Sequence, residues 1–196
     1  RLWVEFEDQM RREERLAQAL VLKGRSLPYG QLNTYGTVRE ILNGYLGNGH
    51  EADLAALRER TDECDVPLLG QLLGLGISLG QYETLGPAEL QREIHQAVLR
   101  LFRRAAQAHP LLLAFEDVHW IDPSSLAFLR HLLPTLSDQR ALVCCLYRPD
   151  FSGLADVTGT PGSAGAHTCI TLPPITESES RELIKNVIAN HDIPES

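Results

Sequence analysis

The sequence predicts an α/β protein of three layers, in which helices cover both faces of a parallel sheet. Two observations lead to this fold class. Short apolar runs that are typical of strands alternate with longer segments of helical spacing. The clearest run, Leu111–Phe115, follows Pro110 and leads directly into Glu116 and Asp117. A continuous apolar run of this length is typical of a strand buried on both faces of a parallel sheet.

Length and composition are those of a globular domain. The 196 residues suffice for one core with a small appendage, and 43% of them are hydrophobic. The net charge of −8 argues against direct nucleic-acid binding by this segment. No apolar run approaches the roughly 20 residues of a membrane span. We therefore expect a cytoplasmic protein without membrane contact and, because it starts at Arg1, a part of a longer chain.

The four cysteines show neither a CxxC pair nor a spacing that binds zinc; they are Cys64, Cys144, Cys145 and Cys169. We interpret them as core residues in a reducing compartment. Because Cys144 and Cys145 are neighbours on an expected strand, their side chains should point to opposite faces of the sheet.

The first elements follow from helical spacing and one short apolar run. Leu2, Phe6 and Met10 recur every fourth residue and predict a helix over 1–18. Residues 19–23 are expected to form a strand or, alternatively, the last turn of that helix. A loop rich in Gly, Pro, Ser and Asn is expected over 24–35, followed by a helix over 37–46 that Gly47, Asn48 and Gly49 terminate.

Two shorter helices are expected next, over 51–63 with Leu54 and Leu57 facing inward, and over 66–75. The segment 74–86 then carries four glycines. Their spacing fits neither GxGxxG nor GxxxxGK[ST], and the two lysines of the chain, Lys23 and Lys185, lie elsewhere. We interpret this segment as a flexible connection, with a phosphate-binding role as the alternative.

The longest helix signal covers 87–108. It opens with a proline and carries one apolar face, formed by Leu90, Ile94, Val98, Leu101 and Ala105. After the strand at 111–115, Asp122 and Pro123 have the order of an N-cap and a first helical residue. Pro134 should end or kink the helix that they begin.

The C-terminal third predicts two further strands and a helix. We expect a buried strand over 141–147, a mobile loop over 151–166 and a short strand over 167–172. Thr176 and Glu179 have the spacing of a capping box, which predicts a helix to about residue 190. Its expected apolar face consists of Leu183, Ile184, Val187 and Ile188.

At this point the chain resembles a known family. LLLAFEDVHWIDPSSLAFLRHLL resembles the Walker B strand and following helix of STAND-type AAA+-like ATPases, modules joined to cyclases, Ser/Thr kinases or LuxR-type regulators. RLWVEF is similar to the helix after the phosphate loop, and GRSLPYGQLNTYGTVREIL to the segment after the second strand. LLGQLLGLGI resembles the family's leucine-rich linker, ALVCCLYRPDF its sensor strand, and ITLPPITESESRELI the entry into its helical lid.

The resemblance implies a P-loop NTPase sheet of the ASCE type that lacks its P-loop strand. The Walker A loop would lie immediately before Arg1, so this stretch alone is expected not to hydrolyse ATP. An exposed gap is expected beside the Walker B strand. Residues 1–172 would form the nucleotide-binding core, and 173–196 the start of a helical lid.

The same resemblance implies roles for three residues, with ATP and Mg²⁺ as cofactors. Glu116 would bind Mg²⁺, and Asp117 would also face the metal and orient the attacking water. Arg148 would contact the γ-phosphate as a sensor. Alternatively, the two acids only solvate the end of the strand, and Arg148 forms an ion pair with Glu116, Asp117 or Asp150.

The neighbouring residues have structural alternatives as well. His119 is expected either to transmit the nucleotide state or to be a packed, hydrogen-bonded histidine, and Trp120 to be a packing indole. Asp122 is expected to be a helix cap. Tyr29 and Tyr35 would approach an adenine or pack within their loop, and loop packing is the preferred interpretation.

Two functions therefore compete. In the first, the chain belongs to an ATP-dependent switch that binds nucleotide, controls an attached output domain (cyclase, kinase or DNA-binding regulator) and forms homo-oligomers. In the second, it is a protein-interaction module that keeps the fold without turnover. A hydrolase of another kind is disfavoured, because the sequence has no GxSxG motif.

Overall fold

The computed structural model describes residues 2–14, 16–28, 33–47, 52–136, 138–155 and 167–189. The chain divides into two compact units, Arg1–Ala166 and His167–Ser196. The division falls a few residues before the predicted boundary at 172, and the assignment of the two parts to a nucleotide-binding core and a lid stays a prediction. Each unit is described by itself.

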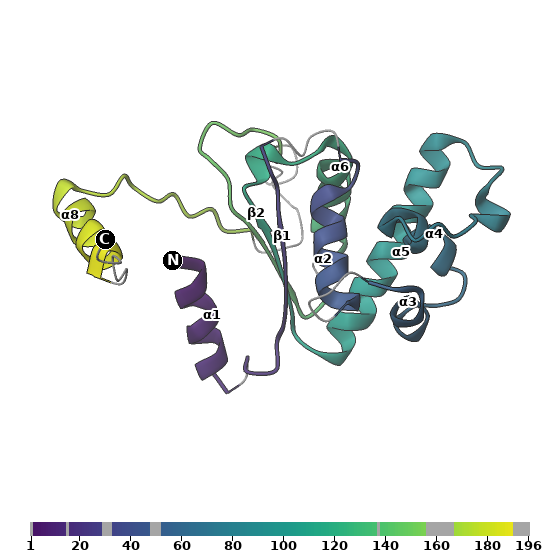
Figure 1. Cartoon of the computed structure of the whole chain (residues 1–196), viewed down its shortest axis with the longest axis horizontal. Coiled ribbons are helices and arrows are strands. Elements are labelled where there is room, and N and C mark those ends of the chain that lie inside the picture. Colours follow the sequence, from purple (N-terminus) through teal and green to yellow (C-terminus); the bar gives the residue numbers. More distant parts are fainter. Residues whose placement is uncertain are drawn as a thin grey trace, which may run out of the picture. The chain divides into compact units, whose positions relative to one another are not determined.

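Three parallel strands form the sheet of the first unit: β1 (Leu20–Arg25), β2 (Leu111–Glu116) and β3 (Ala141–Cys145). Their order is β1-β2-β3 (Figure 1). Leu20 pairs with Leu111, and Leu111 pairs with Ala141. The predicted parallel α/β sheet is confirmed. The prediction of an exposed gap beside the strand at 111–116 is wrong, because β2 pairs with a strand on each side. Within the described residues, the free edges of the sheet belong to β1 and β3.

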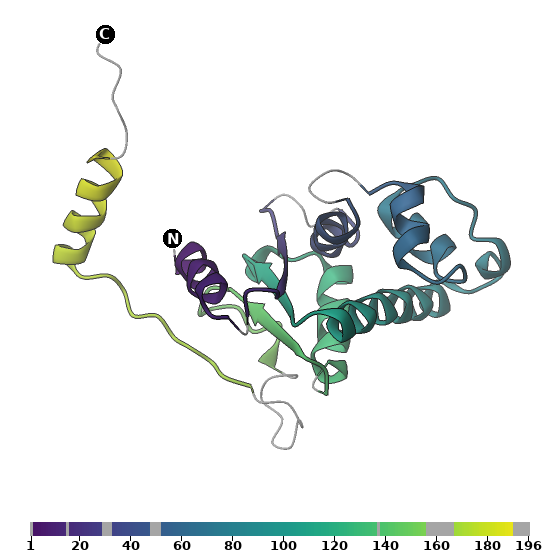
Figure 2. The same ribbon diagram turned by 90° about the horizontal axis from the view of Figure 1, so that it is seen from below.

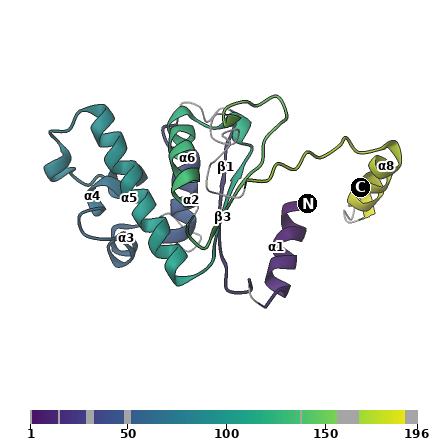
Figure 3. The same ribbon diagram turned by 180° about the vertical axis from the view of Figure 1, so that it is seen from behind.

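Helices cover both faces of this sheet, which confirms the layered α/β class (Figures 1 and 2). On one face lie α2 (Gly36–Leu46), α5 (Pro87–Ala108) and α6 (Pro123–Thr135). On the other lies α1 (Leu2–Arg12), as the view from behind also shows (Figure 3). Lys23 points toward α1, where its Nζ donates to a carboxylate oxygen of Glu7 at 3.1 Å.

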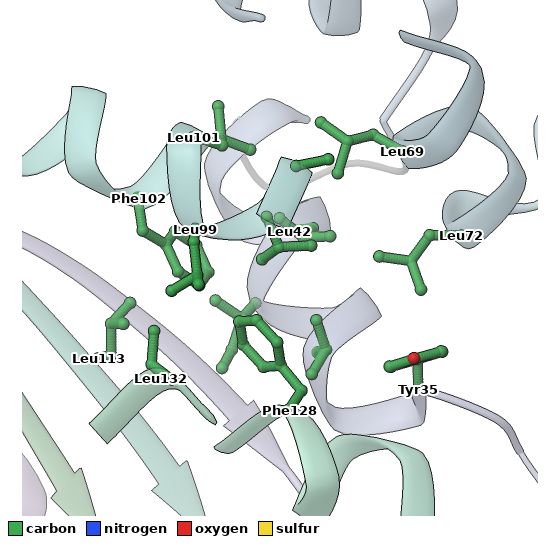
Figure 4. Packing of buried hydrophobic residues seen from close by; sticks show 14 of the residues in the cluster. Tyr35, Leu42, Leu69, Leu72, Leu99, Leu101, Phe102, Leu113, Phe128 and Leu132 are labelled. Atoms are coloured by element: carbon green, nitrogen blue, oxygen red, sulfur yellow. The ribbon is translucent and has the colours of Figure 1, made fainter. Parts of the chain in front are cut away.

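The core lies between the sheet and the three helices. Phe102 of α5 and Phe128 of α6 are fully buried, with ring centroids 6.3 Å apart, and they pack near Leu113 of β2 (Figure 4). Burial of side chains of this size stabilises the fold by about 1.5–3 kcal/mol each relative to full exposure. The helices α2, α5 and α6 are therefore held against the strands whose ends are discussed below.

The first strand runs further than predicted. Residues 20–23 of the segment 19–23 belong to a strand and not to the end of a helix, since α1 already ends at Arg12. Gly24 and Arg25, which were expected in a loop, belong to β1. A Cβ atom at Gly24 would lie 2.5 Å from the carbonyl oxygen of Thr37. Gly24 is therefore required by the close approach of α2 to the strand, and not by a turn.

Two small helices follow α2. Helix α3 (Leu54–Arg60) is shorter than the predicted 51–63, because Asp53 caps it by accepting the N–H of Ala56 at 2.8 Å. Leu57 is buried as expected, but Leu54 is 37% exposed, since it occupies the first position of the helix. Helix α4 (Val66–Leu73) ends at Gly74, whose φ of 75° is left-handed.

The segment after α4 contains a short 3₁₀ helix, η2 (Gly80–Tyr82). The predicted bounds of α5 are confirmed, and Glu89 accepts the N–H of Gly86 at its start at 3.1 Å. Arg100 of α5 donates from Nε and Nη2 to the buried carboxylate of Asp65 at 3.0 and 2.5 Å. This bidentate ion pair fixes the start of α4 on α5.

Strand β3 is neither as long nor as buried as predicted. It ends at Cys145 instead of Tyr147, and Leu142 is 55% exposed because β3 is an edge strand. Cys144 and Cys145 are half-buried, and burial raises the pKa of Cys145 to about 12. Cys64 and Cys169 are exposed, so the interpretation of all four cysteines as core residues is wrong for these two.

The second unit contains one described helix, α8 (Glu177–Ala189). Its capping box is confirmed: Thr176 Oγ1 accepts the N–H of Glu179 at 3.3 Å, and Glu179 Oε2 accepts the N–H of Thr176 at 2.6 Å. The strand predicted over 167–172 is wrong. This segment pairs with no strand in the described part of the chain, and its side chains are exposed. Residue 190, the predicted helix end, lies outside the described residues.

Candidate functional site at the carboxyl ends of the strands

Three charged side chains meet where β1 and β2 end. Arg25 is the last residue of β1 and pairs in register with Glu116, the last residue of β2. Asp117 follows directly, and the N–H of Ser26 donates to the carbonyl oxygen of Glu116 at 2.9 Å. Since ligands of open α/β sheets bind beyond the carboxyl ends of the strands, this edge is the candidate site.

The sequence analysis did not identify Arg25, although this residue makes the closest contact of the site. Its Nε donates to Oδ2 of Asp117 at 2.8 Å, and its backbone N–H donates to Glu40 at 2.8 Å. The hydrogen bond and the charge of Asp117, followed by the charges of Glu116 and Glu40, raise the pKa of Arg25. The strand pairing was the missing signal, because it alone brings Arg25 beside the two acids.

Asp117 has an unusual backbone. Its φ of 55° is left-handed, a conformation that is uncommon for a residue other than glycine and that clusters at functional sites. It precedes the 3₁₀ helix η3 (Val118–Trp120), and its carbonyl oxygen accepts the N–H of Trp120 at 2.8 Å. The direction of its side chain therefore depends on a single tight turn between β2 and α6.

Arg148 lies three residues beyond the end of β3 and is exposed. Pairing continues past β3, because the N–H of Leu146 donates to Phe115 and its carbonyl oxygen accepts from Val118, both at 2.9 Å. Arg148 therefore follows at the same end of the sheet. Among the described residues it forms no ion pair with Glu116, Asp117 or Asp150, so that alternative is not seen and its sensor role stays a prediction.

Asp122 caps α6, as predicted. Its Oδ1 accepts the N–H of Ser125 at 2.9 Å and also the N–H of Tyr35 at 2.9 Å. The carboxylate is only 3% exposed. Asp122 thus joins the start of α6 to the start of α2, a second contact that the sequence pattern did not reveal.

Tyr35 packs within the protein, which agrees with the preferred interpretation. It is 7% exposed, and its hydroxyl group lies 3.0 Å from Nε2 of His95 on α5. Desolvation, with a smaller contribution from His131, lowers the pKa of His95 to about 4, so His95 is neutral at pH 7. Tyr29 lies outside the described residues.

His119 and Trp120 pack against each other, with ring centroids 5.2 Å apart. Nδ1 of His119 is buried and has no hydrogen-bond partner within the described part of the chain. The packing role of both rings is seen, and the hydrogen bond expected for the histidine is not. A role of His119 in transmitting the nucleotide state stays a prediction.

The site suits a magnesium ion that is bound together with phosphate groups. The described residues contain no cluster of three or more side chains that could hold a metal by themselves. Mg²⁺ does not require such a cluster, because it is bound through one or two carboxylates, waters and substrate phosphates. Glu116 and Asp117 offer carboxylate oxygens and are half-buried, which fits this donor set.

Comparison with known proteins identifies a family whose model matches most of this chain. A family model described as "AAA ATPase domain" matches residues 5–145. An uncharacterized protein of Rhizobium meliloti (strain 1021) is 28% identical over 187 residues, which cover 90% of this chain and 17% of that protein. The chain thus spans less than a fifth of this relative's length. No solved structure gives a significant match.

Proposed function

Because this chain belongs to the AAA ATPase domain family, we propose that its α/β unit is the nucleotide-hydrolysing core of a regulatory switch. AAA ATPase domains generally bind ATP with Mg²⁺. The observation that carries the proposal is the pair Glu116 and Asp117 at the carboxyl end of the central strand β2, which would correspond to a Walker B motif.

In this proposal the two carboxylates have different tasks. Glu116, in register with the neighbouring strand, would hold hydrated Mg²⁺. Asp117, turned out of the strand by its left-handed backbone, would orient the attacking water and accept its proton. When bound, Mg²⁺ would neutralise charge on the phosphate oxygens.

Arg25 would influence the second task. Its Nε donates to Oδ2 of Asp117, so the ion pair occupies one of the acceptor sites of this carboxylate while it is formed. Both side chains are partly exposed, 62% for Arg25 and 38% for Asp117, so solvent screens the attraction between them and the pair is weak. A bound anionic substrate would therefore compete readily for the guanidinium group.

Arg148 would serve as the sensor of the γ-phosphate. Its planar guanidinium group suits phosphate oxygens, and it lies exposed at the same end of the sheet as the acids.

The regulatory part of the proposal rests on the resemblance to STAND-type ATPases. Residues 173–196 would begin a helical lid, and an output domain in the same protein, such as a cyclase, a kinase or a DNA-binding regulator, would respond to the nucleotide. Homo-oligomerisation would accompany that response, in the cytoplasm. In the described part of the chain no helix has the length and apolar character of a membrane span.

A second candidate function is a protein-interaction module that keeps the fold without turnover. A GxxxxGK[ST] motif in the segment upstream of Arg1 would support the ATPase instead. The two proposals differ in whether nucleotide binds at all.

Calorimetric titration with ATP and Mg²⁺ distinguishes them. It compares these 196 residues with a version extended upstream by about 30 residues, enough for a strand and a phosphate loop. We expect the extended version alone to bind, and Glu116→Gln to weaken the Mg²⁺-dependent part of that binding. Absence of binding by both versions, with each shown by circular dichroism to be folded, would reject the ATPase proposal and leave the interaction module.

A further inference from the structure

The turn that carries Asp117 is tied at its start to the last residue of β1 and at its end to the residue before α2. At its start, Asp117 contacts Arg25 through an ion pair that is largely exposed. At its end, Asp122 contacts the backbone of Tyr35 from a buried position. These two contacts differ strongly in strength, because solvent weakens the first and not the second.

The contact at Asp122 is built from several groups. One oxygen, Oδ1, accepts both the N–H of Ser125 and the N–H of Tyr35 at 2.9 Å. The other, Oδ2, would lie 3.7 Å from a Cβ atom at Gly36. Hydrogen bonds to a buried carboxylate are charge-assisted and roughly twice as strong as neutral ones. The end of the turn is therefore firmly attached to the start of α2.

Tyr35 is itself a fixed point. It is 7% exposed, its φ is 60°, and its hydroxyl group contacts Nε2 of His95 on the long helix α5. Its ring also lies edge-on to the His95 ring, with centroids 5.8 Å apart. Tyr35 is thus held by α5 and does not simply follow Asp122.

We infer that Asp122 is a positioning residue: by binding the backbone of Tyr35, its carboxylate fixes the turn that directs Asp117. Only η3 and Ile121 separate the two acids, and the exposed ion pair with Arg25 is too weak to define the turn alone. The catalytic part of this inference rests on the proposed function; the structural part does not.

The test measures hydrogen exchange of the amides at 117–121 and ATP turnover in the full protein. Asp122→Ala should raise exchange of these amides about tenfold or more and lower kcat by a similar factor, with KM within about twofold. In Asp122→Ser the hydroxyl group can still cap the helix, but the side chain is one bond shorter and should not reach the N–H of Tyr35. This variant should therefore remain folded and show the same increase in exchange and decrease in kcat as Asp122→Ala. Asp122→Asn retains an acceptor oxygen and should restore both values.

Asp53→Ala is the matched control, because Asp53 caps α3 through the same kind of bond to Ala56 but lies outside the site. This variant should leave both the hydrogen exchange at 117–121 and kcat unchanged. The inference is overturned if Asp122→Ser leaves exchange at 117–121 at the wild-type level, or if Asp53→Ala raises it equally. If the wild-type protein shows no turnover, the proposed function fails, and exchange alone still decides whether Asp122 fixes the turn.

Discussion

Nε of Arg25 lies 2.8 Å from Oδ2 of Asp117, across the ends of two strands that are far apart in the sequence. The register of β1 and β2 places Arg25 opposite Glu116, so one cation faces two adjacent carboxylates. In the proposed ATPase, the acid that orients water is thus held by a cation of its own chain. The predictions below concern this acid and the packing that surrounds it.

Asp117→Asn should retain ATP binding and lose most turnover in a version that carries a phosphate loop. The amide group keeps the size of the side chain but cannot accept a proton from water, so kcat should fall about 100-fold or more. Steady-state hydrolysis together with calorimetry measures both effects. Glu14→Gln, at an exposed turn residue just after α1, serves as a control for the loss of one negative charge. Unchanged kcat in Asp117→Asn would contradict the assigned role.

Gly24→Ala should destabilise the protein, whereas Gly44→Ala should stabilise it. A methyl group at Gly24 would lie 2.5 Å from the Thr37 carbonyl oxygen and 2.7 Å from Cγ1 of Ile41, which forces α2 away from β1. The expected decrease in the free energy of unfolding is about 1–3 kcal/mol. A methyl group at Gly44 meets no atom within 4 Å and should add about 0.5–1 kcal/mol by favouring the helix. Urea unfolding followed by circular dichroism gives both values, and equal effects would contradict the packing argument.

The free energy of unfolding should decrease as the pH falls through the range set by His95. The pKa of His95 is about 4 in the folded protein and about 6.5 in an unfolded chain, so the unfolded chain binds the proton first. The stabilisation is complete above pH 6.5 and is lost toward pH 4. Between pH 7 and pH 5, protonation of this residue should account for a decrease of about 1–2 kcal/mol in the free energy of unfolding.

His95→Gln provides the comparison, since glutamine can still contact the Tyr35 hydroxyl group but does not titrate. Urea unfolding of both proteins at pH 7 and pH 5 should show a smaller loss for the variant. The same pH dependence in both would mean that His95 is already protonated in the folded state near pH 5.

Arg100→Ala should cost much more stability than Arg104→Ala. Asp65, the partner of Arg100, is 3% exposed, so removal of the arginine leaves a buried charge without compensation and should cost about 2–4 kcal/mol. Asp62, the partner of Arg104, is 66% exposed, and its pair should contribute less than about 1 kcal/mol. Thermal unfolding compares the two variants, and a loss of similar size in both would contradict the role of burial.

Local patterns in the sequence predict the elements whose signals are themselves local. The bounds of α5, the cap at Asp122 and the capping box at Thr176 follow from proline position, side-chain chemistry and spacing within one or two turns. The strand at 111–116 is identified for the same reason, because its apolar run has one natural length and a clear end.

The errors arise where the deciding contact comes from elsewhere in the chain. Gly24 resembles a loop residue until helix α2 is placed against it, and Arg25 is an ordinary surface cation until β1 pairs with β2. The apolar spacing of β3 and of 167–172 predicts strands, but pairing decides whether they form: β3 lies at an edge, and 167–172 has no paired partner within the described residues. The type of a residue and its spacing in the sequence do not reveal which distant residues it contacts in the fold.

The order of the strands also bears on how the chain folds. The pairing of Leu111 with Ala141 closes a loop about one third as long as the pairing of Leu20 with Leu111. Closing the longer loop costs about 1 kcal/mol more in chain entropy. We therefore expect β2 and β3 to associate in the folding transition state with α6 between them, and β1 to join afterwards, bringing Arg25 to Asp117 last. Conservative truncations should then give φ-values that are higher at Val143 than at Leu22. The charged site would be among the last features of the fold to form, although the strand that carries its acids is among the first.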